Sequence, residues 1–458
     1  MSEEKKGEAI SRRKYLKYVG AGVAVAAVAA AGVGGYYAGR APAVTPTKKV
    51  TLRYVDYLWT EVSAGGGKSL AYATETFKKM TPEVEDVKWV EVHWETTKSQ
   101  LIAMIGAGDI PDAGLVTSEM VAIKPLVDMG ALEPLDEYLD DELKKELGEA
   151  NLKQGMYEGK IYGILGSPCP NGMLLNRKLF EKAGLMDYYK KWPEQKTGPD
   201  WEEFEEAIVK ISNLGPDIYG FGTSTIYPTL AVDYLCPIIW GFGGDLMDKD
   251  GKPIVNSKPV VETMRWLKWG HYDNKYMPTG LFIRDLRVSF AENKLGMWFD
   301  GPWMLGILDS LGMPREDYAA CPIPKGKVSG KSETVPDSLI RVMFKASKNK
   351  DLSWKWIKYL TSDEEFLKMF MGDTGFMPAI QSYYKTWPEF QTTFFRVFAE
   401  NVAPYTRNNI MWEVKPELYD AAAGFILSAF QSIIMQGADP QKAMDECQRN
   451  LEILYGIE

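Results

Sequence analysis

"VTLRYVDYLW", residues 50–59, opens the part of the chain that decides the fold. Its apolar residues alternate with polar ones, which predicts a half-buried strand with one inward row: Val50, Leu52 and Tyr54. "KSLAYATETFKKM", residues 68–80, follows with the spacing of a helix. The expected buried stripe consists of Leu70, Ala73, Phe77 and Met80. A strand followed by a helix is therefore the first unit of the fold.

The same unit then repeats. "VKWVEVHWE", residues 87–95, alternates again, with Val90, Val92 and Trp94 on one strand face. Residues 99–116 add a helix, a stop rich in glycine and a short apolar strand. Strands that alternate with helices predict a parallel sheet covered on both faces, with ligands bound beyond the carboxyl ends of the strands. The loops after Trp59 and Val116 are therefore the first places to look for a site.

Length and charge limit the class of protein. A chain of 458 residues is too long for one core, so we expect two domains or two discontinuous lobes. The net charge is -9 and the basic residues are interspersed with acidic ones, which makes nucleic acid an unsuitable partner. The 14 Trp and 24 Tyr outnumber the 18 Phe, an excess of rings with a polar group that suits half-wet surfaces.

Metal and triad chemistry are disfavoured. The only histidines are His93 and His271, which leaves little material for a zinc site or a Ser/His/Asp triad. The cysteines lie far apart and form no CxxC pair: Cys169, Cys236, Cys321 and Cys447. We expect free thiols, although spacing alone leaves a disulfide open. No metal and no cofactor is predicted.

The first residues have the organisation of an export signal. Arg12 and Arg13 precede an uncharged stretch rich in Ala, Gly and Val, residues 18–39. The run "SRRKYLK" resembles the twin-arginine translocation motif, whose pathway exports folded proteins. About 20 apolar residues span a bilayer, so the segment is either cut near residues 41–43 or kept as a tether. Both outcomes predict a chain that works outside the cytoplasm.

Two helices of the later chain carry clear signals. In "GPDWEEFEEAIVKIS" we expect Asp200 to cap the helix and Glu203 to close a capping box. The buried stripe expected there is Trp201, Phe204, Ile208 and Ile211. In "DPQKAMDECQRNLEIL" Pro440 marks the helix start, and Cys447 on the apolar side is expected to act as a small hydrophobic residue.

Six phrases in order carry a family resemblance. They are "GAGDIPDAGLV", "YEGKIYGILGSPCPNGMLLNRKLFEKAGL", "WEEFEEAIVKI", "WGFGGDLMDKDGKPIVNSKPVVETMRWL", "FAENKLGMWFDGPWML" and "TGFMPAI". With an export signal in front of them, the chain resembles a family 1 extracellular solute-binding protein, similar to maltose- and trehalose-binding proteins that supply sugars to ABC importers. The resemblance covers essentially the whole chain after the signal.

The resemblance implies an α/β, type II periplasmic-binding-protein fold, in which two discontinuous lobes are joined by a hinge. The chain is expected to cross between lobes near Gly166, Asp337 and Ala379. Residues 1–46 are then the signal or tether with its linker. Lobe one comprises residues 47–166 and 337–378, and lobe two comprises residues 167–336 and 379–458. Small-molecule sites favour such domain interfaces.

The turn Gly301-Pro302-Trp303 is the strongest ligand-binding candidate. In the resembled family this turn faces the cleft, and its aromatic residue stacks on a sugar ring. A pyranose has an apolar C–H face and an edge of hydroxyls, so an indole plane beside a carboxylate suits it. We therefore expect Trp303 to stack and Asp300 to accept hydroxyls, while Trp298, in the short apolar run before them, is expected in the core.

The resemblance supplies further ligand-binding candidates: Trp59, Glu61, Glu119, Trp240 and Trp412. Glu61 and Glu119 fit a solvated surface about as well as a ligand contact. For Asp112, which follows Ile110-Pro111, we expect a role in shaping the turn. Cys169 and Met120 depart from the polar residues usual in sugar-binding relatives, which leaves the identity of the sugar open.

The expected function is capture of a sugar by closure of two lobes, followed by delivery to a membrane permease, without catalysis. We expect the chain to act as a monomer. The alternatives are a secreted glycoside hydrolase, which would also need aromatic and acidic residues in a cleft, and a binding protein for a peptide or polyamine.

Overall fold

The computed structural model describes residues 49–57, 59–62, 66–117 and 123–457. The predicted export signal, residues 1–46, lies outside the described residues, as does Glu119. Two separate sheets organise the described chain. They confirm the expectation of two α/β lobes, and we use lobe one and lobe two for the elements built around the first and the second sheet.

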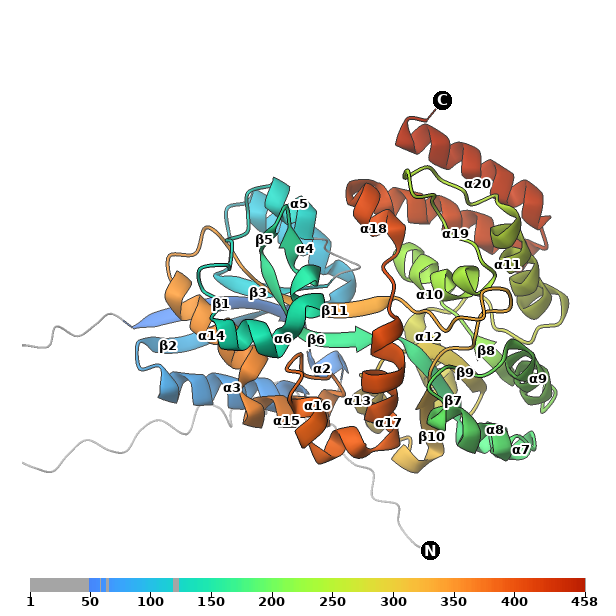
Figure 1. Cartoon of the computed structure of the whole chain (residues 1–458), viewed down its shortest axis with the longest axis horizontal. Helices are drawn as coiled ribbons and strands as arrows, with labels where there is room; N and C mark the ends of the chain where they lie inside the picture. Colours follow the sequence, from blue (N-terminus) through green and yellow to red (C-terminus); the bar gives the residue numbers. More distant parts are fainter. Residues whose placement is uncertain (1–48, 58, 63–65, 118–122, 458) are drawn as a thin grey trace, which may run out of the picture. The chain divides into compact units, whose positions relative to one another are not determined.

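The sheet of lobe one has the strand order β2-β1-β3-β11-β6 (Figure 1). Its strands are β1 (Val50–Tyr57), β2 (Val84–Val92), β3 (Ala113–Thr117), β6 (Gly163–Pro170) and β11 (Pro336–Met343). The strands β1, β2 and β3 are parallel, whereas β11 runs antiparallel to both β3 and β6. The expectation of a wholly parallel sheet is wrong, because β11 enters from a distant part of the chain in the opposite direction.

The helix α3 (Gly66–Met80) of lobe one buries the predicted stripe except for its last member. Leu70, Ala73 and Phe77 are buried, but Met80 at the end of the helix is 63% exposed. Phe77 packs edge-on against Trp356, which also contacts Tyr54 of β1. Aromatic packing between α3, α14 and the sheet therefore forms the core of this lobe.

Several helices and two short strands complete lobe one. They are α2 (Trp59–Val62), α3 (Gly66–Met80), η1 (Trp94–Thr96), α4 (Thr97–Gly106), α5 (Ile123–Asp128), α6 (Asp141–Gln154), β4 (Met156–Tyr157), β5 (Lys160–Ile161), α14 (Lys350–Ser362) and α15 (Glu364–Thr374). The hydroxyl of Ser69 donates to the Asp373 carboxylate at 2.6 Å, which joins α3 to α15.

The sheet of lobe two has the order β10-β7-β9-β8. Its strands are β7 (Gly172–Asn176), β8 (Tyr219–Gly222), β9 (Leu295–Asp300) and β10 (Tyr318–Cys321). The pair β8 and β9 is parallel, and the other two pairs are antiparallel. Every residue of β9 is buried, and Trp298 within it is 1% exposed, so its predicted place in the core is confirmed.

The helices between these strands surround the second sheet. They are α7 (Arg177–Lys182), α8 (Met186–Lys191), η2 (Trp192–Glu194), α9 (Trp201–Ser212), α10 (Pro228–Gly241), α11 (Lys258–Lys268), η3 (Trp269–Asp273), α12 (Ile283–Ala291), α13 (Met304–Ser310) and η4 (Arg315–Asp317). The predicted stripe of α9 is buried, including Trp201. The Trp201 ring packs edge-on against Phe204 and Phe242.

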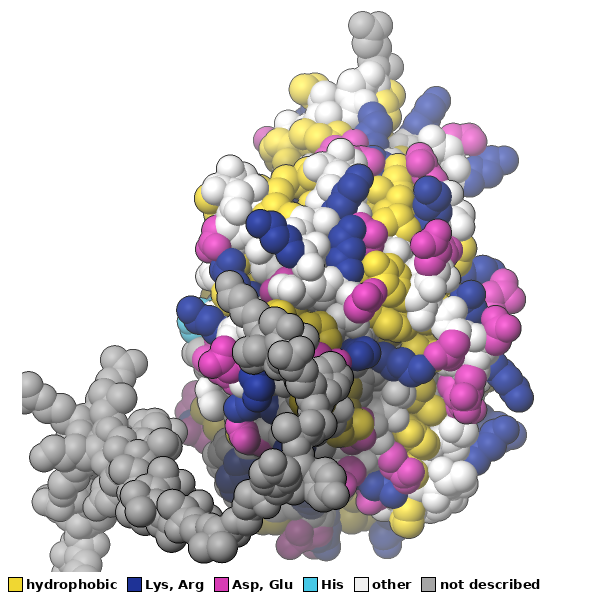
Figure 2. All heavy atoms as spheres, turned by 90° about the vertical axis from the view of Figure 1, so that its left-hand side faces the viewer, with side chains coloured by type: hydrophobic (Ala, Val, Ile, Leu, Met, Phe, Trp, Pro, Cys, Tyr) yellow, Lys and Arg dark blue, Asp and Glu magenta, His cyan; other side chains and the backbone are white. Residues whose placement is uncertain are grey.

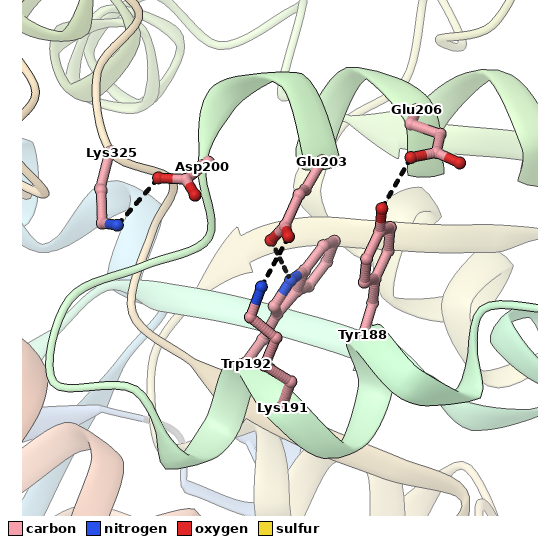
Figure 3. A network of polar contacts seen from close by, with 7 residues as sticks. All are labelled: Tyr188, Lys191, Trp192, Asp200, Glu203, Glu206 and Lys325. Carbon is pink, nitrogen blue, oxygen red and sulfur yellow. Dashed lines mark hydrogen bonds and ion pairs between the residues drawn. The ribbon is translucent and has the colours of Figure 1, made fainter.

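The predicted capping box of α9 is absent (Figure 3). Asp200 holds the N-cap position, but its carboxylate accepts a hydrogen bond from Lys325 at 2.8 Å and none from the helix backbone. The Glu203 carboxylate accepts from Lys191 at 2.6 Å and from the Trp192 indole at 3.0 Å. The prediction was wrong because side chains from other segments occupy both carboxylates.

The C-terminal part consists of short helices followed by two long ones. They are α16 (Tyr383–Thr386), η5 (Pro388–Gln391), α17 (Thr393–Arg396), η6 (Val397–Val402), η7 (Ala403–Tyr405), α18 (Ile410–Val414), η8 (Pro416–Leu418), α19 (Tyr419–Gln436) and α20 (Pro440–Tyr455). The expected start of α20 at Pro440 is confirmed, and the Asp439 carboxylate caps it. Cys447 is buried, as expected of a small hydrophobic residue.

Residues 416–436, which include α19, are apolar and long enough to cross a membrane. The helix nevertheless lies beside α10, α11 and α20 in Figure 1, and its Ile426, Phe430 and Ile433 are completely buried. A core helix of a globular lobe has the same composition as a membrane span. Packing therefore accounts for its hydrophobicity.

The chain passes between the two sheets at adjacent strands. Gly166 lies on β6 and Asp337 on β11, and Asp337 pairs with Cys169 across these strands. Further along, the Trp387 indole donates to Glu364 of lobe one at 3.1 Å. Arg396 pairs with Glu194 of lobe two at 2.6 Å.

The surface and the cysteines agree with the composition. On the face drawn in Figure 2, lysine and arginine side chains alternate with acidic ones, which gives this face no basic stripe. The four cysteines are free and buried, so the expectation of free thiols is confirmed.

Candidate functional site

Rings from the two lobes meet at Trp94, in η1 directly after β2. The Trp94 ring lies parallel to Phe282, with centroids 6.0 Å apart and an interplanar angle of 4°. It meets Tyr227 edge-on at 6.3 Å. Phe282 precedes α12 and Tyr227 precedes α10, so the N-terminal ends of two helices of lobe two present rings to lobe one. We call these three residues the ring cluster.

A cavity of about 420 Å³ lies beside the ring cluster. Both lobes line it: Lys98, Ser99 and Ile102 come from α4, and Tyr227, Pro228, Thr229 and Asp420 come from lobe two. The Lys98 ammonium donates to the Asp420 carboxylate at 2.6 Å. The volume is in the range of small-molecule sites, which combine apolar walls with a few polar groups. This cavity is the candidate ligand site.

A smaller cavity of about 180 Å³ reaches Trp94 from α12 and α13. Its lining consists of Trp94, Arg284, Arg287, Val288, Ile307, Ser310 and Leu311. Within the ring cluster, Trp94 therefore lines the smaller cavity beside α12 and α13, and Tyr227 lines the cavity of about 420 Å³. Residues of the ring cluster therefore line two separate cavities.

Asp300, predicted to accept ligand hydroxyls, is completely buried. Its carboxylate accepts from the Arg287 guanidinium at 3.2 Å and from the Gly301 backbone N–H at 2.8 Å. Burial raises the pKa of Asp300, and the nearby Arg287 works against that rise. In this structure Asp300 orients Arg287 at the wall of the smaller cavity, and its role toward a ligand stays a prediction.

Trp303, predicted to stack on a sugar, is 6% exposed. Its ring stacks on Phe376 with centroids 5.6 Å apart and an interplanar angle of 22°. The Gly301-Pro302-Trp303 turn folds the indole back so tightly that a Cβ on Gly301 would come within 2.0 Å of the ring. The face of the indole that lies against Phe376 is therefore occupied by protein, and the predicted stacking on ligand is untested.

Trp59 is also held by protein. Its indole N–H donates to the Asp56 carboxylate at 2.9 Å, and its ring packs edge-on against Phe370 and Phe376. Burial raises the pKa of Asp56 to about 6, while Arg341 opposes this rise. Trp59 is 1% exposed, so its predicted contact with ligand would require the start of α2 to move.

Trp240 borders a different cavity, of about 440 Å³, within lobe two. The Arg407 guanidinium lies over its ring at 4.7 Å, and the same guanidinium pairs with Asp245. The indole N–H of Trp240 donates to Asp245 at 3.3 Å. Trp240 is not among the lining residues of the cavity of about 420 Å³ between the lobes. Its predicted ligand role therefore has no support from that cavity.

Trp412 is the most accessible of the predicted tryptophans, being only partly buried. It meets Tyr419 edge-on at 6.4 Å. The Tyr419 hydroxyl donates to the Asp233 carboxylate at 2.6 Å, and Asn409 donates to the same oxygen at 3.1 Å. Burial raises the pKa of Asp233 to about 8, against the effect of these hydrogen bonds. A neutral carboxylic acid thus lies behind Trp412 at neutral pH.

The side chains of two predicted acidic residues, Glu61 and Glu119, are not described in the structure. Glu119 is among the residues without a described position, and only the backbone of Glu61, in α2, is described. Asp112 shapes the turn as expected: its carboxylate accepts from the Arg53 backbone N–H at 2.9 Å and from the Ser347 hydroxyl at 2.6 Å.

Strand ends carry buried polar oxygens that have no hydrogen-bond partner in the described structure. They are Thr117 Oγ1 at the end of β3, Asn171 Oδ1 between β6 and β7, and Thr223 Oγ1 after β8. Buried polar atoms are nearly always satisfied by protein, water or ligand. Strand ends are also where α/β sheets bind ligands.

A family model described as bacterial extracellular solute-binding protein matches residues 61–365. This chain belongs to that family. The match covers the ring cluster, every strand of the two sheets except β1, and every lining residue of the cavity of about 420 Å³ except Asp420. Because the family is extracellular and consists of binding proteins, this solute-binding protein acts outside the cytoplasm, and its fold and the predicted resemblance are confirmed.

Relatives and a solved structure agree with this assignment. A binding protein of Brucella abortus (strain 2308) is 28% identical over 322 residues, which are 69% of this chain and 74% of that protein. A maltotriose-binding protein of Pyrococcus abyssi is 24% identical over 312 residues, which are 67% of this chain and 62% of that protein. A Thermotoga lettingae ABC transporter solute-binding protein bound to α-D-tagatose superposes with a TM-score of 0.75 at 21% identity. It covers 88% of this chain and 99% of that chain, a likeness that shows the fold.

The sequence analysis missed the ring cluster and the pair Lys98 and Asp420. It placed Trp94 on one face of a strand, but β2 ends at Val92 and the indole lies at the contact with lobe two. The Tyr227-Pro228 pair could have been recognised in the sequence, because proline marks the first turn of a helix. It would have placed Tyr227 at the start of α10. The partners of Trp94 lie more than a hundred residues away, and periodicity is a local measure.

Proposed function

We propose that this solute-binding protein captures an oligosaccharide between its two lobes and delivers it to the permease of an ABC importer. The supporting observation is the cavity of about 420 Å³ bounded by Tyr227 of the ring cluster, the hydroxyls of Ser99 and Thr229, and the pair Lys98 and Asp420. A pyranose presents C–H groups to a ring and hydroxyls to charged donors and acceptors. The lining therefore has the chemistry that carbohydrate requires.

The relatives support a sugar as the ligand class. The Pyrococcus protein is a maltotriose-binding protein, and the Thermotoga structure contains tagatose. The cavity of about 420 Å³ is lined by Tyr227 and the cavity of about 180 Å³ by Trp94, and the contact between these two rings places the cavities near each other, which supports a ligand longer than one ring. Neither relative fixes the sugar for this chain, since Cys169 departs from the polar residue usual in the family.

Binding without catalysis agrees with the lining. A glycoside hydrolase places two carboxyl groups on either side of the scissile bond. Among the described lining residues of the cavity of about 420 Å³ between the lobes, the only carboxylate is Asp420, and it is paired with Lys98. Asp233 and Asp300 are buried in hydrogen bonds with protein. A paired carboxylate can accept a hydrogen bond from a ligand hydroxyl, but a hydrolase needs a second carboxyl group.

Capture would follow from contacts that a ligand makes with both lobes at once. A ligand that bridges the lobes stabilises the joined arrangement by its differential affinity for it. Driving the equilibrium from mostly open to mostly closed takes about 5.5 kcal/mol of differential affinity. Stacking and charge-assisted hydrogen bonds are of the right size to provide it.

The division of the chain between the lobes is part of this proposal. Lobe one would comprise residues 47–166 and lobe two residues 167–336, as predicted, with a return to lobe one at 337. For the third crossing, the bond from Trp387 to Glu364 and the pair of Arg396 with Glu194 favour a position between 387 and 396 rather than Ala379. We further propose export by the twin-arginine signal and a monomeric state.

Ligand-dependent stability tests the proposal. The full-length protein is heated with maltotriose, an arabinooligosaccharide, tagatose, a peptide mixture or a polyamine. A ligand at 100 times its Kd adds about 2.7 kcal/mol of stability, which a thermal shift detects. We expect a shift with an oligosaccharide, and chromatography of the same mixture should show the sugar intact.

A matched pair of variants assigns the site. Tyr227→Ala removes a ring from the cavity wall, and we expect it to weaken binding about five- to thirtyfold, since an aromatic wall residue contributes on the order of 1–2 kcal/mol. Tyr272→Ala removes a ring that is 37% exposed and absent from the cavity lining, and it should leave affinity unchanged. Hydrolysis products would favour the enzyme, and a response to peptide or polyamine alone would overturn the sugar assignment.

A further inference from the structure

Two neighbouring residues of lobe one, Trp94 and Lys98, contact lobe two. Trp94 in η1 reaches Phe282 and Tyr227, and Lys98, one helical turn later in α4, reaches Asp420. Both sets of partners belong to lobe two. The contacts therefore hold only while the two lobes are together, and each is made directly between side chains of the protein.

The aromatic part of this contact is extensive. Trp94 lies parallel to Phe282, and the rings of Tyr227 and Phe282 meet edge-on at 6.0 Å. Trp94 is partly buried, so separation of the lobes would return much of an indole face to water. Burial of apolar area and favourable ring geometry both oppose separation.

The ion pair of Lys98 and Asp420 lies at the solvent-exposed edge of the contact between the lobes. The Lys98 side chain is 31% exposed and that of Asp420 is 59% exposed. Exposed pairs gain little free energy and are screened by salt. The ion pair therefore aligns the two faces, and the ring cluster supplies most of the attraction.

The contacts leave space for a ligand. The cavity of about 420 Å³ has Lys98, Tyr227 and Asp420 in its lining, and the cavity of about 180 Å³ has Trp94. The side chains that make the contacts between the lobes thus also line the two cavities. A ligand would find them already placed instead of displacing them.

We propose that Trp94 and Lys98 form a latch that holds the two lobes together in part of the molecules before any ligand binds. A contact that exists in one of two states shifts their populations by its own free energy. The latch thereby sets the fraction of ligand-free protein in the joined arrangement. This inference depends only on the lobes and their contacts, and it does not need the ligand to be a sugar.

The distance between the lobes in solution tests the latch. Spin labels are attached to the full-length protein at Ala103→Cys in α4 and Ala421→Cys in α19, both exposed positions. The four native cysteines are buried, so the label should react at the introduced sites. Pulsed electron paramagnetic resonance without ligand then gives the populations of short and long distances.

Removal of the indole should open the protein. With Trp94→Ala we expect the ratio of joined to separated molecules to fall about tenfold, and with Trp94→Phe by less, because part of the stack remains. Circular dichroism of each variant checks that the fold is retained. An unchanged distance distribution in a folded Trp94→Ala protein would overturn the proposal.

Charge reversal provides a second, independent test that keeps the side chains long. Lys98→Glu and Asp420→Lys should each lower the joined fraction about two- to threefold at low salt, because like charges then face each other. The double variant restores opposite charges and should restore the joined fraction. If the double variant is as open as either single one, or if 1 M NaCl abolishes the short distance completely, the latch as described is wrong.

Discussion

The indole of Trp303 stacks on the ring of Phe376 with centroids 5.6 Å apart. This pair joins the Gly-Pro-Trp turn at the end of β9 in lobe two to the segment after α15 in lobe one. Gly375 stands next to it with a φ of +83°, and a Cβ there would come within 2.1 Å of the Pro302 carbonyl oxygen. Two phrases that carried the family resemblance, "GPW" and "TGFMPAI", are therefore neighbours in space.

The tightness of the turn gives a first prediction. In Gly301→Ala the added Cβ would lie 2.0 Å from the Trp303 ring, so the indole must leave its stack on Phe376. Such overpacking costs about 1–3 kcal/mol. We expect urea unfolding to show this loss, and near-ultraviolet circular dichroism to show a changed tryptophan environment.

Gly372→Ala is the matched control. Gly372 lies in α15, and a Cβ there meets nothing within 4 Å. Alanine in a helix interior gains about 0.5–1 kcal/mol over glycine. Equal stability of the parent and Gly301→Ala would show that the turn has room to relax.

Asp233 gives a prediction about the loss of stability between pH 4 and pH 8. Burial raises its pKa to about 8 from an ordinary value of 3.8, so the folded protein holds a proton that the unfolded chain has released. A carboxyl with a raised pKa contributes stability below its unfolded pKa and loses it as the pH rises through the folded value. Between pH 4 and 8 this loss amounts to at most about 1.4 kcal/mol per pH unit.

Asp233→Asn should remove this dependence, because an amide stays neutral. Relative to the parent, we expect the free energy of unfolding of the variant to rise by about 2–4 kcal/mol between pH 5 and pH 9. Denaturant titrations at the two pH values measure it. Asp420→Asn, at an exposed position, is the control that separates the effect of burial from the loss of a charge. If the free energies of unfolding of the parent and of Asp233→Asn differ by the same amount at both pH values, the assignment is contradicted.

His271 gives the opposite dependence at acid pH. It is completely buried beside Phe430, and burial lowers its pKa to about 4 from 6.5. Protons then bind the unfolded chain more readily, so stability falls as the pH drops from 6.5 toward 4. In His271→Leu we expect the loss between pH 7 and 4.5 to be smaller by about 2 kcal/mol.

The chain itself supplies the control, since His93 is the only other histidine and is exposed. His93→Leu should keep the acid dependence of the parent. If both histidine variants lose stability with acid as the parent does, the acid sensitivity belongs to the carboxylates.

Local patterns predicted the parts of the fold that local forces decide. The strand predicted at residues 50–57 matches β1, but Tyr54–Tyr57 are all buried, so its second half is covered on both faces. The helical stripe at residues 201–211 matches α9, because burial of one face requires that period. The place of Trp298 in the core followed from the same reasoning.

Long-range partners account for what the sequence could not show. β11 joins the first sheet antiparallel after more than a hundred intervening residues. Lys325 withdraws Asp200 from the helix backbone. At the site, Trp94 was assigned to a strand face, and nothing near it in sequence indicates that Phe282 and Tyr227 are its partners.

Trp412 and Trp298 separate binding from stability. Trp412 is partly buried on α18 and meets Tyr419, which bonds to Asp233 behind it. If Trp412 stacks on the ligand as predicted, Trp412→Ala should weaken oligosaccharide binding about tenfold and cost little stability. Isothermal titration at pH 7 and urea unfolding of the same samples measure both quantities.

Trp298→Ala should do the reverse. Trp298 is 1% exposed within β9, and truncation of a buried tryptophan costs about 3–5 kcal/mol. At a temperature where the variant remains folded, its affinity should stay within about twofold of the parent. Should Trp412→Ala bind oligosaccharide as well as the parent does, the indole belongs to the wall of lobe two and the ligand is held by other residues of the groove.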